Sequence, residues 1–159
     1  MDTDKEQIKQ KLATTRADLL AVTRDLDRET WTQPVYAHAD ETEWSAMDLL
    51  RHLAWAESGM LRLMRQIRAG EEGVPPDFDL DRYNASGVNK LKDEMPAELL
   101  QRLENNRQQL LDFVNTLGPD DWDKKGRHGS LRILTIGEIL EVIADHEAEH
   151  LHDLGQVIA

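Results

Sequence analysis

The sequence predicts an all-α protein folded as a four-helix bundle. Helix-favouring Ala, Leu, Glu, Gln, Arg and Lys dominate, whereas two Phe and two Tyr leave little of the aromatic content that is typical of strands. Four long segments also carry apolar residues at helical spacing. A chain of 159 residues fits one domain, so we expect residues 1–159 to share a single core.

The N-terminal segment predicts a helix from about Asp4 to Asp27. Its apolar residues recur at three-, four- and seven-residue spacings, as on one face of an amphipathic helix. They are Ile8, Leu12, Leu19, Val22 and Leu26. A polar stretch from Trp31 to Glu43, which includes Pro34, breaks this period. That stretch is expected to connect the first two helices.

A capping box predicts where the second helix begins. Ser45 can cap the helix while Asp48, three residues later, reaches back to the Ser45 amide. Trp44 can pack on Leu49 as a hydrophobic staple across this start. The helix is expected to continue to Gly70.

A crossover loop and the third helix follow. The segment EEGVPPDFDL contains a glycine and two adjacent prolines, which cannot continue a helix. The third helix is expected from Asp81 to Leu117 with a break near Pro96, because a proline suits the first turn of a new helical segment. Gly118 followed by Pro119 is a typical stop.

A second capping box predicts the start of the fourth helix, with Thr135 as the cap and Glu138 three residues later. This helix is expected from Ile136 almost to the C-terminus. Four amphipathic helices pack most economically as a bundle with their apolar faces inward. A functional site would then lie between the helices.

Charge and composition restrict the partners and the chemistry. Thirty-one acidic and nineteen basic residues give a net charge of −12, which repels phosphate backbones, so nucleic acid is not expected as a partner. No apolar run approaches the roughly 18 residues of a membrane span, and the N-terminus is charged, so we expect a cytoplasmic protein without membrane contact. Cysteine is absent, so any thiol chemistry must use an external thiol.

Three histidines lie where they could hold one divalent metal ion. His146 and His150 are four residues apart on one edge of the fourth helix's apolar arc, which would place their Cβ atoms about 5 to 6 Å from each other. His52 lies at the margin of the apolar arc of the second helix, whereas His152 points away. Three neutral imidazoles suit divalent Zn, Ni, Fe or Cu and leave coordination positions open for water or substrate.

The depths of these histidines predict the direction of their helices. His52 lies seven residues after the expected cap of its helix, and His150 lies about seven before the expected end of the fourth helix. At a rise of about 1.5 Å per residue, the two reach the same level if the second and fourth helices run antiparallel. The metal site therefore requires this antiparallel arrangement.

Two carboxylates near the histidines allow other chemistry. His146 to His150 matches the H-E-x-x-H signature of zinc proteases, in which Glu147 would be the general base, but only nine residues follow and none supplies the downstream third ligand. Glu147 lies near the centre of its apolar arc, and Glu57 lies inside the arc of the second helix. A buried carboxylate needs a partner, for which a metal, its bound water or an arginine would serve.

These motifs together resemble the DinB/YfiT-like family over nearly the whole chain. They comprise Trp44-Ser45 followed by Leu49 and His52-Leu53, the distant pair His146 and His150, and Tyr83-Asn84 after the acidic DFDLDR stretch. The resemblance implies a four-helix bundle with an up-down-down-up arrangement, and a homodimer. It also implies one divalent ion, nickel or zinc, held by His52, His146 and His150.

The same resemblance implies a function on small molecules. Characterised relatives include S-transferases and isomerases that use mycothiol or bacillithiol, so a transferase that uses such an external thiol is one hypothesis. In it Glu147, Glu57 or Asn84 would orient water or substrate, and Trp55 and Tyr83 would shape the substrate pocket. The alternatives are a non-catalytic bundle that binds a metal or a small ligand, and a metal-dependent hydrolase with Glu147 as base.

Overall fold

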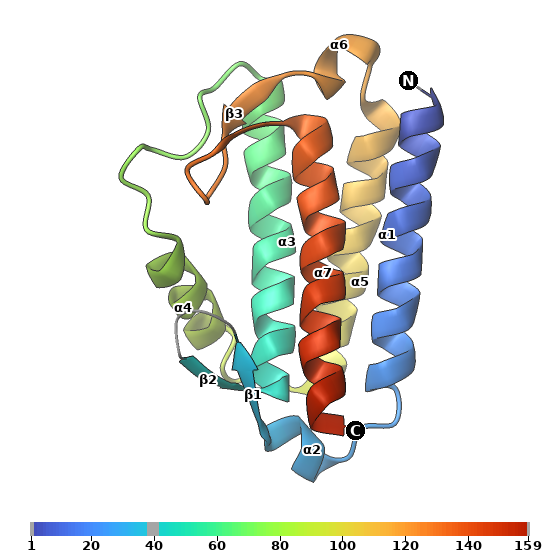
Figure 1. Cartoon of the computed structure of the whole chain (residues 1–159), viewed down its shortest axis with the longest axis vertical. Coiled ribbons are helices and arrows are strands. Elements are labelled where there is room, and N and C mark those ends of the chain that lie inside the picture. The colour runs from blue at the N-terminus through green and yellow to red at the C-terminus, as the bar shows by residue number, and fades with distance from the viewer. Residues whose placement is uncertain (1, 38–41, 159) are drawn as a thin grey trace.

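Four long helices form the body of the computed structural model, which describes residues 2–37 and 42–158. They are α1 (Asp2–Thr23), α3 (Ala46–Arg68), α5 (Pro96–Thr116) and α7 (Ile136–Ile158). In Figure 1, α1 and α7 run from top to bottom, whereas α3 and α5 run from bottom to top. The up-down-down-up bundle is therefore confirmed, and α3 and α7 run antiparallel as the histidine depths require.

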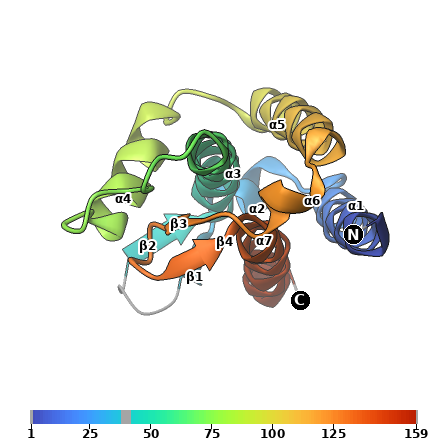
Figure 2. The same cartoon turned by 90° about the horizontal axis from the view of Figure 1, so that it is seen from above.

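Short elements complete the fold. They are α2 (Arg28–Thr32), α4 (Leu80–Lys90), α6 (Pro119–Trp122), β1 (Pro34–Ala37), β2 (Thr42–Ser45), β3 (Lys125–Arg127) and β4 (Ile133–Thr135). β1 pairs with β2 and β3 pairs with β4, both antiparallel. Seen from above, α4 and the β3–β4 hairpin lie outside the four-helix ring, on the side of α3 and α7 (Figure 2).

Local hydrogen bonds begin the two helices that carry the histidines. The Ser45 hydroxyl accepts the Asp48 amide at 3.1 Å, and the Asp48 carboxylate accepts the Ser45 amide at 3.2 Å. Thr135 and Glu138 make the equivalent pair at 3.0 and 2.9 Å before α7. Both predicted capping boxes are confirmed, so the start of each helix is determined within four residues of sequence.

Some predicted boundaries are wrong. The first helix ends at Thr23, because Asp27 caps the separate helix α2. The expected third helix is two helices, α4 and α5, since Pro96 begins a new helix and α4 packs against α3 outside the bundle. The two hairpins were not expected either, because strands of three or four residues are too short to show a clear alternation.

The core consists of two apolar clusters, one near each end of the bundle. On each long helix, a buried polar side chain lies between the residues of one apolar cluster and the residues of the other. We call these side chains the polar layer: Thr15, Arg16, Glu57, Arg107 and Glu147. Among the described residues, no helix is long and apolar enough to cross a membrane.

Candidate metal centre and adjoining pocket

The three predicted metal ligands lie together between α3 and α7. The Nε2 atom of His146 is 2.9 Å from Nε2 of His52 and 3.0 Å from Nε2 of His150. All three ligand nitrogens lie within 4.8 Å of one another. His52 and His150 are buried, while His146 is half-buried and is the most accessible of the three.

The nitrogen geometry fits a shared cation better than it fits hydrogen bonds alone. A neutral imidazole has one acceptor nitrogen, with a single lone pair. His146 would have to accept from both neighbours at that one lone pair, divide its single Nε2 proton between both, or leave one close nitrogen pair without a proton between them. Three lone pairs directed at a common ion remove this conflict, and neutral imidazole nitrogens are ligands that Zn and Ni accept.

The surroundings keep the His52 ring neutral and place an aromatic ring and a carboxylate next to the histidines. Burial, with the neighbouring His150 as the second cause, lowers the pKa of His52 to about 3, so its ring is unprotonated near neutral pH. Trp44 packs against His52 with ring centroids 4.8 Å apart. The Asp153 Oδ2 atom lies 3.4 Å from Nδ1 of His150, one helical turn later, in the position from which carboxylates commonly orient a metal-binding histidine. The sequence analysis missed Asp153, although its i+3 spacing was visible.

Glu57 and Glu147 lie in the polar layer, next to the histidines but tied to arginines. Arg107 donates from Nη2 to Oε2 of Glu57 at 2.6 Å and to Oε2 of Glu147 at 2.8 Å. Arg16 donates from Nε to Oε1 of Glu147 at 2.6 Å and from Nη2 to Oε2 of Glu57 at 3.3 Å. The Thr15 hydroxyl also donates to Glu147 at 2.8 Å. Each long helix thus contributes one charged side chain, and two arginines balance two carboxylates.

The ion pairs determine the protonation of Glu147. Burial alone would raise its pKa, but the charges and hydrogen bonds of Arg107 and Arg16 outweigh burial and lower it. Glu147 is therefore a carboxylate and a weak base. Of the partners expected for it, the structure provides arginine. Arg16 lies between Leu12 and Leu19 on the apolar stripe of α1. An arginine at such a position was the sequence signal for a buried partner of Glu147.

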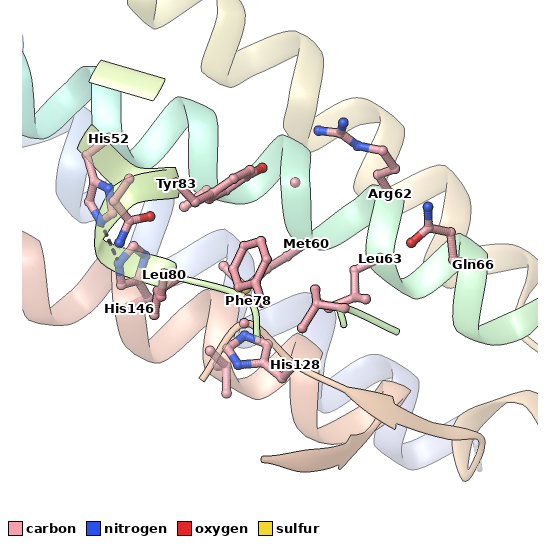
Figure 3. Close-up of a pocket in the computed structure, with 16 residues that line it drawn as sticks. His52, Met60, Arg62, Leu63, Gln66, Phe78, Leu80, Tyr83, His128 and His146 are labelled. Atoms are coloured by element: carbon pink, nitrogen blue, oxygen red, sulfur yellow. Dashed lines mark hydrogen bonds between the residues drawn. The ribbon is translucent and has the colours of Figure 1, made fainter. Parts of the chain in front are cut away.

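A cavity of about 280 Å³ adjoins the histidines. Its walls come from α3, the crossover loop, α4, the β3–β4 turn and α7 (Figure 3). His52 and His146 line one end, and Arg62, Gln66 and His128 are polar residues that also line it. Most of the remaining lining is apolar, and none of the described lining residues carries a carboxylate.

The crossover loop is held in place as one wall of this cavity. Gly73 has φ of +99°, and a Cβ there would lie 2.4 Å from the Arg127 carbonyl oxygen, so this close approach requires glycine. The Val74 amide donates to the Arg127 carbonyl at 2.9 Å, and the Arg127 guanidinium donates to the Val74 carbonyl at 3.0 Å. Phe78, further along the same loop, lines the cavity.

The predicted pocket residues lie at different depths. Tyr83 and Asn84, both on α4, line the cavity. Trp55 does not line it but contacts Tyr83, with ring centroids 5.4 Å apart. Gly87 brings α4 close to this tryptophan, since a Cβ at position 87 would lie 2.2 Å from its ring. Arg62 and His128 could not be singled out from the sequence, because neither lies on an apolar stripe or in a motif.

Comparison with known proteins shows the family. The model of the DinB superfamily matches residues 12–154, so the chain belongs to the DinB superfamily. No curated protein sequence is significantly similar to it. The resemblance inferred from the histidine and tryptophan motifs is confirmed.

Solved structures share the fold at low sequence identity. YfiT from Bacillus subtilis, a probable metal-dependent hydrolase, is 19% identical with a TM-score of 0.76, over 96% of this chain and 85% of that chain. A mycothiol-dependent maleylpyruvate isomerase is 18% identical with a TM-score of 0.71, over 93% of this chain but only 60% of its own. The colibactin self-resistance protein ClbS is 20% identical with a TM-score of 0.79, over 97% and 95%.

The exclusion of nucleic acid as a partner is wrong. ClbS, which has this fold, was crystallised in complex with a double-stranded DNA. Net charge is a sum over the whole surface, whereas contact with a phosphate backbone depends on where individual basic side chains lie. A net charge of −12 therefore does not exclude such a partner.

Proposed function

We propose that the chain is a metal-dependent enzyme in which His52, His146 and His150 hold one divalent ion, nickel or zinc, and which uses an external low-molecular-weight thiol to act on a small molecule. One observation carries the proposal. Two of the three histidines, His52 and His146, line the 280 Å³ cavity, so the open coordination positions would face it. A cytoplasmic location, where thiols of the mycothiol or bacillithiol type are available, belongs to this proposal.

The side chains around the cavity favour a nucleophile from outside the protein. A divalent cation at the histidines would lower the pKa of a thiol or water that coordinates it and so supply a nucleophile near neutral pH. The chain has no cysteine, and no carboxylate is among the described residues that line the cavity. The apolar walls would exclude water, and Tyr83 and Asn84 would orient the substrate.

The proposed reaction is a group transfer to sulfur. The thiol loses its proton to solvent, and its sulfur forms a bond to an electrophilic carbon of the substrate. The leaving group departs with the electrons of the broken bond. The mycothiol dependence of the maleylpyruvate isomerase, which shares this fold, supports thiol chemistry at such a site.

Metal-dependent hydrolysis is the second candidate. A second cavity of about 10 Å³, roughly enough for one water, is lined by His146, Glu57 and Glu147, and YfiT is a probable metal-dependent hydrolase. Glu147 or Glu57 would then act on that water. Both carboxylates are paired with Arg16 and Arg107, and these arginines lower the pKa of Glu147 and make it a poor base, which is why we favour the thiol reaction.

A comparison of turnover with and without thiol tests the proposal. Nickel- or zinc-loaded protein is mixed with a panel of electrophiles, with low-molecular-weight thiols present or absent, and products are identified by mass spectrometry. We expect turnover that needs both metal and thiol, is lost in His52→Ala and is retained in His152→Ala. Turnover without thiol would favour hydrolysis. Thiol-dependent turnover that is as fast in His52→Ala as in the wild-type protein would contradict the proposal. The absence of turnover with any electrophile would also contradict it.

A further inference from the structure

The cavity has chemically different ends. α3 runs along it, with His52 near one end and Arg62 and Gln66 ten and fourteen residues further on. At about 1.5 Å per residue, the Cα atoms of these two residues lie some 15 to 21 Å along the helix axis from that of the histidine. Figure 3 shows His52 and His146 on one side, Arg62 and Gln66 on the other, and Met60 and Leu63 between them. A ligand that spans the cavity would therefore meet apolar walls along most of its length.

Arg62 provides a positive charge at the far end. Arg62 is exposed, its guanidinium can only donate hydrogen bonds, and no ion pair or hydrogen bond joins it to another of the described residues. Tyr83 lies close enough to respond to that charge: burial raises the pKa of the tyrosine hydroxyl, while Arg62 opposes this rise. The two carboxylates of the polar layer, Glu57 and Glu147, are paired with other arginines. The charge of Arg62 is thus available to a ligand.

His128 provides a neutral donor in the same cavity. The Ser130 amide donates to Nδ1 of His128 at 3.1 Å, and an amide can only donate, so Nδ1 carries the lone pair. Burial, followed by the charge of Arg132, lowers the pKa of His128, so the ring is neutral near pH 7. Its single proton then lies on Nε2, and the ring offers a donor rather than an acceptor.

We propose that the cavity binds a small organic carboxylate, with the carboxylate at Arg62, the body of the ligand between the apolar walls, and the His128 donor available to another polar atom of the ligand. A single guanidinium matches one negative charge better than it matches a doubly charged phosphate. A volume of 280 Å³ lies at the lower end of small-molecule sites, so the ligand is small. That this ligand is the substrate of the proposed reaction rests on the proposed function, whereas carboxylate binding does not.

Paired probes separate charge recognition from apolar burial. Binding of 4-phenylbutyrate and of the neutral 4-phenylbutanamide is measured by calorimetry on chelator-treated protein, so that no metal can bind the carboxylate. We expect the carboxylate to bind at least about tenfold more tightly than the amide, as for a hydrogen bond to a charged group. Arg62→Gln should abolish this preference.

Arg65→Gln is the matched control, because Arg65 is an exposed arginine on the same helix that does not line the cavity. It should leave the preference unchanged. Equal binding of both probes, binding of neither, or an equal loss in Arg65→Gln and Arg62→Gln would overturn the inference. Because the measurement needs neither metal nor turnover, failure of the proposed function would leave the expected result intact.

Discussion

The Nε2 atoms of His52 and His146 lie 2.9 Å apart, although 94 positions separate the two residues in the chain. Their proximity depends on how α3 is set against α7. A slide of one helix by a single turn, about 5.4 Å, would carry the two nitrogens out of reach of a common ion. Metal affinity is therefore a sensitive measure of the packing between these antiparallel helices.

Metal content should depend on the buried histidines. We expect about one divalent ion per chain in the wild-type protein and its loss in His52→Ala and His150→Ala, because two imidazoles hold an ion much more weakly than three. Elemental analysis of the purified proteins, with circular dichroism to verify folding, measures this. His152→Ala is the control, since His152 is exposed on the same helix. Unchanged stoichiometry in both buried variants would show that the ligand set is wrong.

The polar layer should contribute strongly to stability. Arg107→Ala leaves Glu57 and Glu147 buried with only Arg16 to balance them, so we expect a loss of about 3 to 5 kcal/mol in the free energy of unfolding. Arg102→Ala, on the same helix but half exposed in its pair with Glu94, should cost less than about 1 kcal/mol. Urea denaturation measures both. A loss in Arg107→Ala as small as the loss in Arg102→Ala would mean that the polar layer contributes little to stability.

The metal-free protein should lose stability in acid through His52. Its pKa is about 3 in the folded chain and near its ordinary 6.5 when unfolded, so between these values the unfolded chain binds a proton that the folded chain does not. The free energy of unfolding should therefore fall as pH decreases from about 6.5 toward 3. His52→Gln cannot bind this proton and should show a shallower slope in urea titrations. Equal slopes would indicate that other groups cause the dependence.

Two glycine substitutions should have opposite effects. In Gly87→Ala the new Cβ would lie 2.2 Å from the Trp55 ring, so α4 must move, and we expect a loss of about 1 to 3 kcal/mol in the free energy of unfolding. In Gly155→Ala no atom lies within 4 Å of the new Cβ, and α7 should gain about 0.5 to 1 kcal/mol. Thermal denaturation compares the two. Equal effects would exclude close packing at Gly87.

Much of the fold and of the metal cluster could be predicted because its signals are local. The capping boxes at Ser45 and Thr135 are hydrogen bonds within four residues, and the four-residue spacing of His146 and His150 places both on one side of a helix. The matching depths of His52 and His150 predicted that α3 and α7 run antiparallel. These features follow from helix geometry and from the order of residues alone.

Tertiary packing decided the rest. Arg16 and Glu147 are 131 positions apart, and only the assembled bundle makes arginine, rather than a metal or water, the partner of that carboxylate. In the folded chain α4 and α5 are separate helices, and the packing brings Arg62, Tyr83 and His128 into the lining of one cavity. By itself, then, the sequence determined where the helices begin, which faces they bury and which histidines could meet. The ion pairs and the pocket needed the tertiary structure, because they form between segments whose approach no local periodicity encodes.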